Sequence, residues 1–141
     1  MARIKLELPE VFPFSTEIDI RITDVNYGQH VGNDAMLSLI QEARVRFLRR
    51  HGMSEIDVGG CGMIMVDAVL ILQAEVFYGD TLVVEMAVRD VSRCGCDFLY
   101  RMTKKGTGEH VAKAKTGIAC FDYAARKMVR LSDKLRALAD L

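Results

Sequence analysis

The chain has 141 residues, of which 50% are hydrophobic and 27% are charged, and its 19 basic and 19 acidic residues give a formal net charge of zero. This composition is typical of a globular domain and lies outside the range of disordered chains. The sequence contains no basic stripe, which disfavours nucleic-acid binding. We therefore predict one domain over residues 1–141, long enough to bury about two thirds of its unfolded surface.

The N-terminus has neither the apolar run nor the cleavage pattern of a signal peptide, and the longest apolar run, Ala68 to Leu72, is far too short to cross a membrane. We expect a cytoplasmic protein that does not associate with a membrane. The four cysteines fit that compartment as reduced thiols. Cys94 and Cys96 form a C-x-C pair with no histidine at metal-ligand spacing, so the sequence predicts no metal site.

The first predicted strand covers residues 16–23, where isoleucine alternates with polar residues as on a half-buried strand. A polar loop follows, and residues 33–50 then predict a helix with Asn33 as its N-cap and Gly52 as its stop. The helix is predicted because its apolar residues fall on one stripe. This stripe contains Met36, Leu39, Ile40, Ala43 and Phe47 and is widened by Leu37 and Leu48.

The sequence from residue 63 to residue 123 is typical of strands joined by short glycine-containing turns. The predicted strands cover residues 63–77, 82–91, 97–103 and 110–123. Such short turns imply antiparallel pairing, and Ser132 is expected to cap a short C-terminal helix over residues 133–141. Because a lone apolar-striped helix must pack against the sheet, we predict an α+β fold in which an antiparallel sheet of about five strands wraps one long helix.

Three stretches of the chain carry a family resemblance. They are DVNYGQHVGN at residues 24–33, EARVRFL at residues 42–48 and YGD at residues 78–80. Together they resemble the hot-dog-fold acyl-CoA thioesterases of the 4-hydroxybenzoyl-CoA thioesterase-like superfamily, whose usual pattern is D-x-D-x-x-G-H-V-N-N before the helix. The resemblance runs from residue 14 to the last helix. It implies a hot-dog fold and the hydrolysis of an acyl-CoA thioester.

Two positions depart from the family pattern. Asn26 stands where many relatives carry a catalytic aspartate, and an amide can be neither a general base nor a carboxylate nucleophile. Gln29 replaces the glycine before the histidine, and the glycine lies one place earlier, at Gly28. The Gln-His-Val order is instead similar to plant acyl-carrier-protein thioesterases, whose sites use amide and histidine side chains. The resemblance therefore implies thioester hydrolysis with a different set of catalytic groups.

The polar loop and the start of the helix supply the first catalytic candidates. The first N–H groups of a helix carry partial positive charge and can polarise a carbonyl placed near Asn33. His30 can exchange a proton near neutral pH, and its ordinary alternative is a loop histidine bonded to a backbone carbonyl. Asp24 can orient His30 or act directly, and otherwise it is a turn aspartate. Asn26 can hold the water or the thioester, and otherwise it forms an Asx-turn.

Two carboxylates outside this loop are further candidates. Relatives of one branch use a helix glutamate, which makes Glu42 the fourth catalytic candidate, although Glu42 and Arg46 at i,i+4 favour a surface ion pair. Asp67 interrupts an apolar strand where an unpaired charge would be costly, so either its face meets solvent or a groove, or Asp67 belongs to the site. The residues expected to contact substrate are Gly28, Gln29, Gly32, Asn33 and Asp67.

The function predicted from the resemblance is acyl-CoA thioester hydrolysis by direct attack of water, with CoA present only as part of the substrate and no cofactor. An acyl carrier protein is the alternative acyl donor. Asp24-x-Asn26 also matches the first half of D-x-N-x-x-H, the signature of hot-dog enoyl-CoA hydratases, but the histidine here comes one place late. A non-catalytic acyl-CoA binding module is the third interpretation, which Asn26 favours.

The quaternary structure is predicted from the sheet and from the resemblance. A lone curved sheet exposes an edge strand, and exposed edges invite pairing. Relatives join two sheets edge to edge and place the site between subunits. We therefore expect a homodimer or a dimer of dimers.

Overall fold

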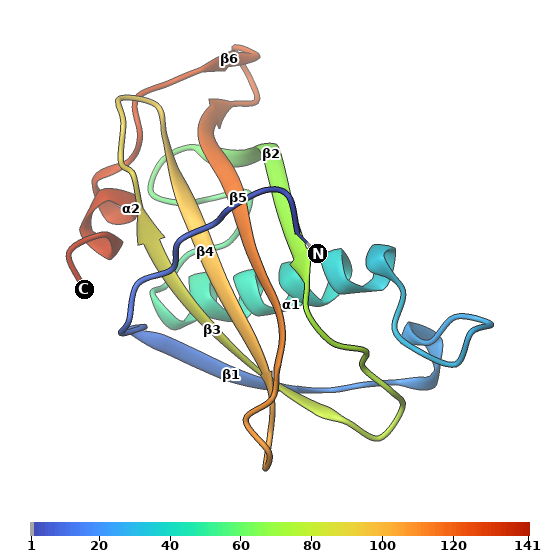
Figure 1. The fold of residues 1–141 in the computed structure, drawn as a ribbon. Coiled ribbons are helices and arrows are strands. Elements are labelled where there is room, and N and C mark those ends of the chain that lie inside the picture. Colours follow the sequence, from blue (N-terminus) through green and yellow to red (C-terminus); the bar gives the residue numbers. More distant parts are fainter. Residues whose placement is uncertain (1) are drawn as a thin grey trace.

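The computed structural model describes residues 2–141, and in it one long helix lies across one face of an antiparallel sheet (Figure 1). The strands are β1 (Phe14–Asp19), β2 (Gly62–Leu72), β3 (Thr81–Arg89), β4 (Gly95–Lys104), β5 (His110–Asp122) and β6 (Lys127–Met128). The helices are the one-turn 3-10 helix η1 (Ile22–Asp24), the long helix α1 (Asn33–Arg50) and the short helix α2 (Asp133–Leu138).

The strand order in the sheet is β1-β3-β4-β5-β2, and β6 adds a short pairing to the end of β5. All these pairings are antiparallel. The short turns predicted the β3–β4 and β4–β5 pairs, whereas β2 pairs with β5 and not with β3, the next strand in the sequence. The α+β prediction is therefore confirmed, with a sheet that holds one more short strand than expected. Strand β2 pairs only with β5, so its other edge is unpaired within this chain.

The apolar stripe of α1 forms the core together with the inner face of the sheet. Phe47 is fully buried, and its ring centroid lies 5.1 Å from that of Phe14 on β1 and 5.8 Å from that of Phe98 on β4. The predicted stripe is confirmed except for Leu37, which is 41% exposed. The core face of α1 instead includes Arg44. This helix is therefore fixed to the middle of the sheet along most of its length, and its start is fixed with it.

Arg44 is buried because two polar side chains, those of Tyr100 and Glu55, bond to its guanidinium. Its Nη1 donates to the hydroxyl of Tyr100 at 3.4 Å, and its Nε donates to Glu55 at 3.1 Å. The Tyr100 hydroxyl also lies 2.8 Å from the hydroxyl of Thr116 on β5. Burial raises the pKa of Tyr100, so this phenol stays neutral and bonds as a hydroxyl. The network satisfies the buried polar groups and ties α1 to two strands.

Several predicted boundaries are wrong, among them the end of the C-terminal helix, which lies at Leu138 and not at residue 141. The first strand ends at Asp19 because the chain turns into η1, where Ile22 is 67% exposed. The strand predicted over residues 63–77 ends at Leu72, and its last part is an irregular segment. The N-cap of α1 is Gly32, with Asn33 as the first helical residue. In contrast, Ser132 caps α2 as predicted and accepts a hydrogen bond from the Leu135 N–H at 3.2 Å.

None of the helices in residues 2–141 is long and apolar enough to span a membrane.

Candidate active site

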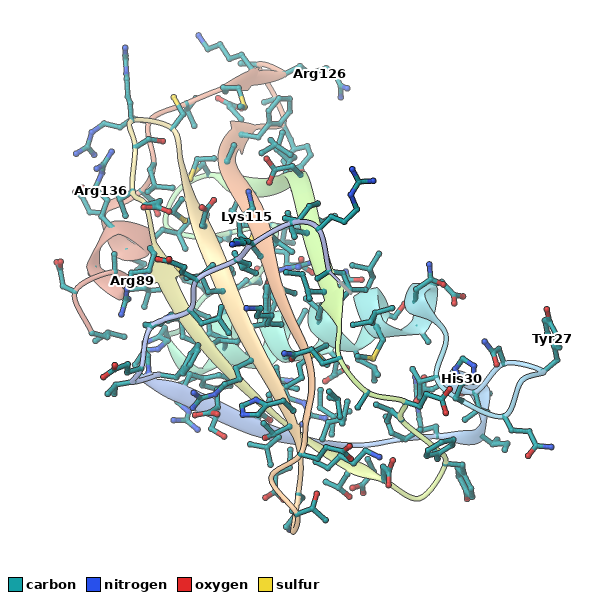
Figure 2. All side chains as sticks on the ribbon, in the orientation of Figure 1. Tyr27, His30, Arg89, Lys115, Arg126 and Arg136 are labelled. Atoms are coloured by element: carbon teal, nitrogen blue, oxygen red, sulfur yellow. The ribbon has the colours of Figure 1, made fainter. Side chains whose placement is uncertain are left out.

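A cavity of about 450 Å³ opens at the first turn of α1. One wall comes from the loop before the helix and from the helix start, and the opposite wall comes from the end of β2 and the segment after it. The lining residues are Asn26, His30, Val31, Gly32, Asn33, Met36, Leu72, Gln73, Ala74, Glu75 and Val76. The volume lies in the usual range for small-ligand sites, and polar groups share the lining with apolar side chains. In Figure 2, His30 lies on this loop beside the segment that follows β2.

Backbone hydrogen bonds hold the loop before α1 in a closed turn. The Asn26 N–H donates to the His30 carbonyl at 3.0 Å, and the Gln29 N–H donates to the Asn26 carbonyl at 2.9 Å. Gln29 takes a left-handed conformation with φ of 69°. At the tip, Tyr27 is fully exposed and points away from the fold (Figure 2). The turn therefore directs Asn26 and His30, its first and last polar residues, back to the cavity.

Asn26 uses its amide oxygen inside the loop. Its Oδ1 accepts a hydrogen bond from the Gly28 N–H at 2.9 Å, which forms the Asx-turn that was the alternative interpretation. Its Nδ2 faces Gly32, because a Cβ built on Gly32 would lie 3.4 Å from that nitrogen. Asn26 therefore offers the cavity a hydrogen-bond donor beside the helix start.

The hydrogen bond of His30 determines which ring nitrogen can act as a base. Its Nδ1 lies 3.3 Å from the carbonyl oxygen of Val31. A carbonyl only accepts, so Nδ1 carries the proton and Nε2 of the neutral ring has a free lone pair. That Nε2 also lies on the Gly28 side of the loop, 3.3 Å from a Cβ built on Gly28. His30 thus combines the backbone contact of an ordinary loop histidine with a lone pair that can accept a proton.

The helix start supplies further donors. No side chain within residues 2–141 caps α1, because the N-cap is Gly32, with φ of −75° and ψ of 161°. The first-turn N–H groups have no partners inside the helix, and the positive end of the helix dipole lies at the same place. Gly32 and Asn33 line the cavity, so these donors border it. The arrangement can stabilise negative charge on a carbonyl oxygen.

Asp24 lies outside the cavity wall and is engaged elsewhere. Its carboxylate accepts from the Arg21 backbone N–H at 2.8 Å and from the Arg21 guanidinium at 3.2 Å, and only 6% of the residue is exposed. The hydrogen bond with Asp24, followed by the attraction of its charge, raises the pKa of Arg21. Asp24 therefore stabilises η1, the turn that leads into the loop, which matches its interpretation as a turn aspartate.

Glu42 also lies away from the cavity. Its carboxylate accepts from Arg46 Nε at 2.8 Å, and Arg46 in turn donates to the Thr16 hydroxyl at 3.0 Å and to the Glu17 carbonyl at 2.7 Å. The residue lies nine positions beyond Asn33, which is roughly 14 Å along a helix. Within one chain, Glu42 forms the surface pair that its spacing favoured.

Asp67 has the surface environment that was one of its two interpretations. Its side chain is 59% exposed, pairs with Lys115 Nζ at 3.1 Å and accepts from the Gly117 N–H at 3.1 Å. A bulge between Met65 and Asp67 sets its direction, and the missing side chain of Gly117 leaves room for the carboxylate. Asp67 does not line the cavity within one chain.

Of the nine residues predicted for the site, the cavity brings together Asn26, His30, Gly32 and Asn33. Gly28 and Gln29 shape the loop and do not line the cavity. Gln73 and Glu75 also line the cavity and were not predicted for the site, because residues 63–77 were predicted as one strand. The signal that could have shown the end of this strand is the polar Gln-Ala-Glu sequence at residues 73–75, between the apolar strand and the turn. No group of three or more His, Cys, Asp or Glu side chains that could hold a metal ion is found in residues 2–141.

Comparison with known proteins identifies the family to which this chain belongs. The family model of the thioesterase-like superfamily matches residues 20–138, and the chain belongs to this superfamily. No curated protein sequence matches it significantly.

Solved structures of thioesterases have the same fold. A 1,4-dihydroxy-2-naphthoyl-CoA thioesterase from Synechocystis is 22% identical with a TM-score of 0.81, covering 90% of this chain and 95% of that one. A thioesterase from Thermus thermophilus complexed with coenzyme A and Zn is 19% identical with a TM-score of 0.77, and the match covers 93% of this chain and 100% of that one. A DHNA-CoA thioesterase from Staphylococcus aureus is 21% identical with a TM-score of 0.75, covering 83% and 79%. The hot-dog fold predicted from the sequence is confirmed.

Proposed function

We propose that this protein hydrolyses an acyl-CoA thioester to the free acid and CoA. The observation that carries the proposal is the cavity at the start of α1, which joins uncapped helix N–H groups to Asn26 and His30. Thioester hydrolysis needs donors near the carbonyl oxygen and a base near the attacking water. Family membership supports the reaction class, and the CoA carrier and the roles of individual residues are our proposal.

The proposed binding mode places the thioester carbonyl oxygen near the first-turn N–H groups of α1, with Asn26 Nδ2 as an additional donor. His30 Nε2 lies on the loop side and can accept a proton from water or position it. Apolar residues of the lining, among them Met36, Leu72 and Val76, would contact the acyl group. In this arrangement the negative charge that develops on the oxygen meets donors already in place, which is how such sites lower the barrier.

We further propose that the active form is a homodimer, or a dimer of dimers, joined along β2. The outer edge of this strand is unpaired within the chain, and the strand exposes three large apolar side chains, Met65 (51%), Val66 (53%) and Leu72 (56%). An exposed apolar edge is a template for pairing with another strand. Leu72, at the end of β2, also lines the cavity, so a partner on this edge would lie beside the proposed site. A monomeric mass in light scattering at micromolar concentration would contradict this assembly.

The test of the function is a thiol-release assay across acyl-CoA substrates of increasing chain length and aromatic acyl-CoAs, repeated with an acyl carrier protein as the acyl donor. We expect thiol release with at least one acyl-CoA. Tight acyl-CoA binding without turnover at any pH would instead identify a binding module. Loss of enoyl absorbance without thiol release would identify a hydratase.

The substitution Asn26→Asp separates the two enzymatic interpretations. It keeps an oxygen for the Gly28 N–H and restores the carboxylate that many relatives carry. Under the thioesterase proposal it keeps or raises thiol release. Under the hydratase interpretation, which needs the amide of the D-x-N pattern, it abolishes turnover.

A further inference from the structure

The proposed reaction needs a proton acceptor, and the carboxylates predicted for the site are already engaged. Asp24 is held by the backbone and side chain of Arg21, Glu42 by Arg46, and Asp67 by Lys115 and Gly117. None of the three lines the cavity at the start of α1. Asn26, at the position where many relatives carry the carboxylate, cannot accept a proton.

The opposite wall of the cavity contains a carboxylate that the family pattern does not point to. Glu75 belongs to the segment after β2 and is the one acidic residue among those that line the cavity in residues 2–141. No side-chain hydrogen bond or ion pair of Glu75 is found within residues 2–141, whereas Asp24, Glu42 and Asp67 are each paired with a cation. Glu75 is therefore a free carboxylate on the cavity that contains His30 and the helix start.

The backbone around Glu75 is fixed on both sides. The Ala74 N–H donates to the Val111 carbonyl of β5 at 3.2 Å, and the neighbouring Gln73 N–H donates to the same oxygen at 2.9 Å. On the other side, the Val76 carbonyl accepts from the Val31 N–H at 2.8 Å, and Val76 is only 2% exposed. The last bond joins the segment directly to the loop that holds His30. Glu75 is thus held opposite the loop by contacts on each side.

We propose that Glu75 is the general base of the thioester hydrolysis, an inference that rests on the function proposed above. The Glu75 carboxylate takes one proton from a water molecule as the water oxygen forms a bond to the thioester carbon. The carbonyl electron pair moves to the oxygen, which the first-turn N–H groups of α1 and Asn26 Nδ2 stabilise. When the pair returns, the carbon–sulfur bond breaks with its electrons on sulfur, and the proton held by Glu75 passes to the thiolate. The products are the acid and the CoA thiol, and Glu75 is again a carboxylate.

In this scheme His30 and Asn26 position the water and the thioester, while the proton is carried from the opposite wall. The division explains why an amide at residue 26 is compatible with hydrolysis: the carboxylate has been supplied by another element. It also gives Glu75→Gln a definite expected effect, because glutamine keeps the shape and loses the basic oxygen.

The test compares Glu75→Gln with Glu17→Gln in the thiol-release assay. Glu17 is an exposed glutamate of β1, 52% exposed and paired with Lys105 at 3.0 Å, and it does not line the cavity, so it controls for the loss of one surface charge. We expect Glu75→Gln to lower kcat by roughly 10²–10⁴ with a small change in KM, the range for general acid–base groups. Glu17→Gln should stay within about twofold of wild type.

A second variant tests the chemistry of the carboxylate. Glu75→Ala leaves space for a small carboxylate, and added formate should restore part of its kcat without affecting Glu75→Gln. An active wild-type protein with undiminished kcat in Glu75→Gln would overturn the role of Glu75 and leave the proposed function standing. A decrease in Glu75→Gln that is confined to KM, or a Glu75→Ala variant that formate does not rescue, would also overturn it. Absence of thiol release by wild type with every acyl donor would overturn the proposed function, and the role of Glu75 with it.

Discussion

The two halves of helix α1 treat polar groups in opposite ways. In the second half, Arg44 is buried, and its guanidinium bonds to Glu55 and to Tyr100, which in turn bonds to Thr116. At the start, the N-cap is a glycine, and the first-turn N–H groups border a cavity with Asn26 and His30. Paired polar groups in the core hold the helix in place, whereas polar groups with spare bonding capacity can bind and activate a substrate.

The largest stability difference is expected between two neighbouring arginines of α1. Arg44→Met removes the charged partner of Glu55 and one of the two partners of the buried Tyr100 hydroxyl, which keeps Thr116. It should lower the free energy of unfolding by about 2–3 kcal/mol, moderated by the partial exposure of Glu55. Arg46→Met is the matched control. It removes an exposed pair, with 41% and 52% of the side chains accessible, and should cost less than about 1 kcal/mol.

Urea unfolding of both variants measures the difference. Equal losses for the two arginines would contradict the assignment of Arg44 to the structural half of the helix.

A smaller effect of opposite sign is expected at the loop before the helix. Gln29 has a φ of 69°, a conformation that costs a residue with a side chain roughly 1–2 kcal/mol. Gln29→Gly removes this cost. Glycine also gives the unfolded chain more conformational freedom, which opposes folding by roughly 0.5–1 kcal/mol. The net result should be a stabilisation of about 0.5–1 kcal/mol. Gln29→Ala, which keeps the strained backbone, is the control and should change little.

The same unfolding experiment measures both Gln29 variants. A destabilised Gln29→Gly variant would mean that the side chain of Gln29 stabilises the loop more than its backbone strains it.

Removal of metal ions is expected to have no effect on activity. We propose that hydrolysis needs no metal or redox cofactor, so thiol release should be unchanged after treatment with EDTA and dialysis. Activity that a chelator removes and a divalent ion restores would contradict this and would move the polarising charge from the helix start to a metal.

The sequence predicted the fold well, because the signals are local and repeated. The apolar stripe of residues 36–48 predicted α1, and the short turns predicted antiparallel strands. The first strand and the second were drawn too long because alternation and β-branched residues continue past the true ends, at Asp19 and Leu72. Neither alternation nor β-branching can show where a tertiary contact ends a strand. The hydrogen bond between the Val31 N–H and the Val76 carbonyl is such a contact.

The site was only half predictable for a related reason. Asn26, His30, Gly32 and Asn33 are close in sequence, and the family pattern marks them. Glu75 reaches the same cavity from a segment more than forty residues later, through pairing of β2 with β5 and the bond to Val31. Sequence spacing contains no information on that approach. Conversely, Glu42 and Asp67 looked chemically suitable, but Arg46 and Lys115 engage them, and the i,i+4 rule could find only the first of these pairs.

The central claim is that the chemistry resides at the start of α1, in the loop that ends there. The most direct measurement is kcat for thiol release by His30→Ala and by Asn26→Ala on the best acyl-CoA substrate, with unfolding in urea to verify that each variant is folded. We predict that His30→Ala lowers kcat by roughly 10²-fold, through loss of the group that positions the water, and that Asn26→Ala also lowers it, through loss of the Nδ2 donor. Folded variants that both release thiol at the wild-type rate would contradict the claim and reduce residues 24–33 to a connection between η1 and the helix.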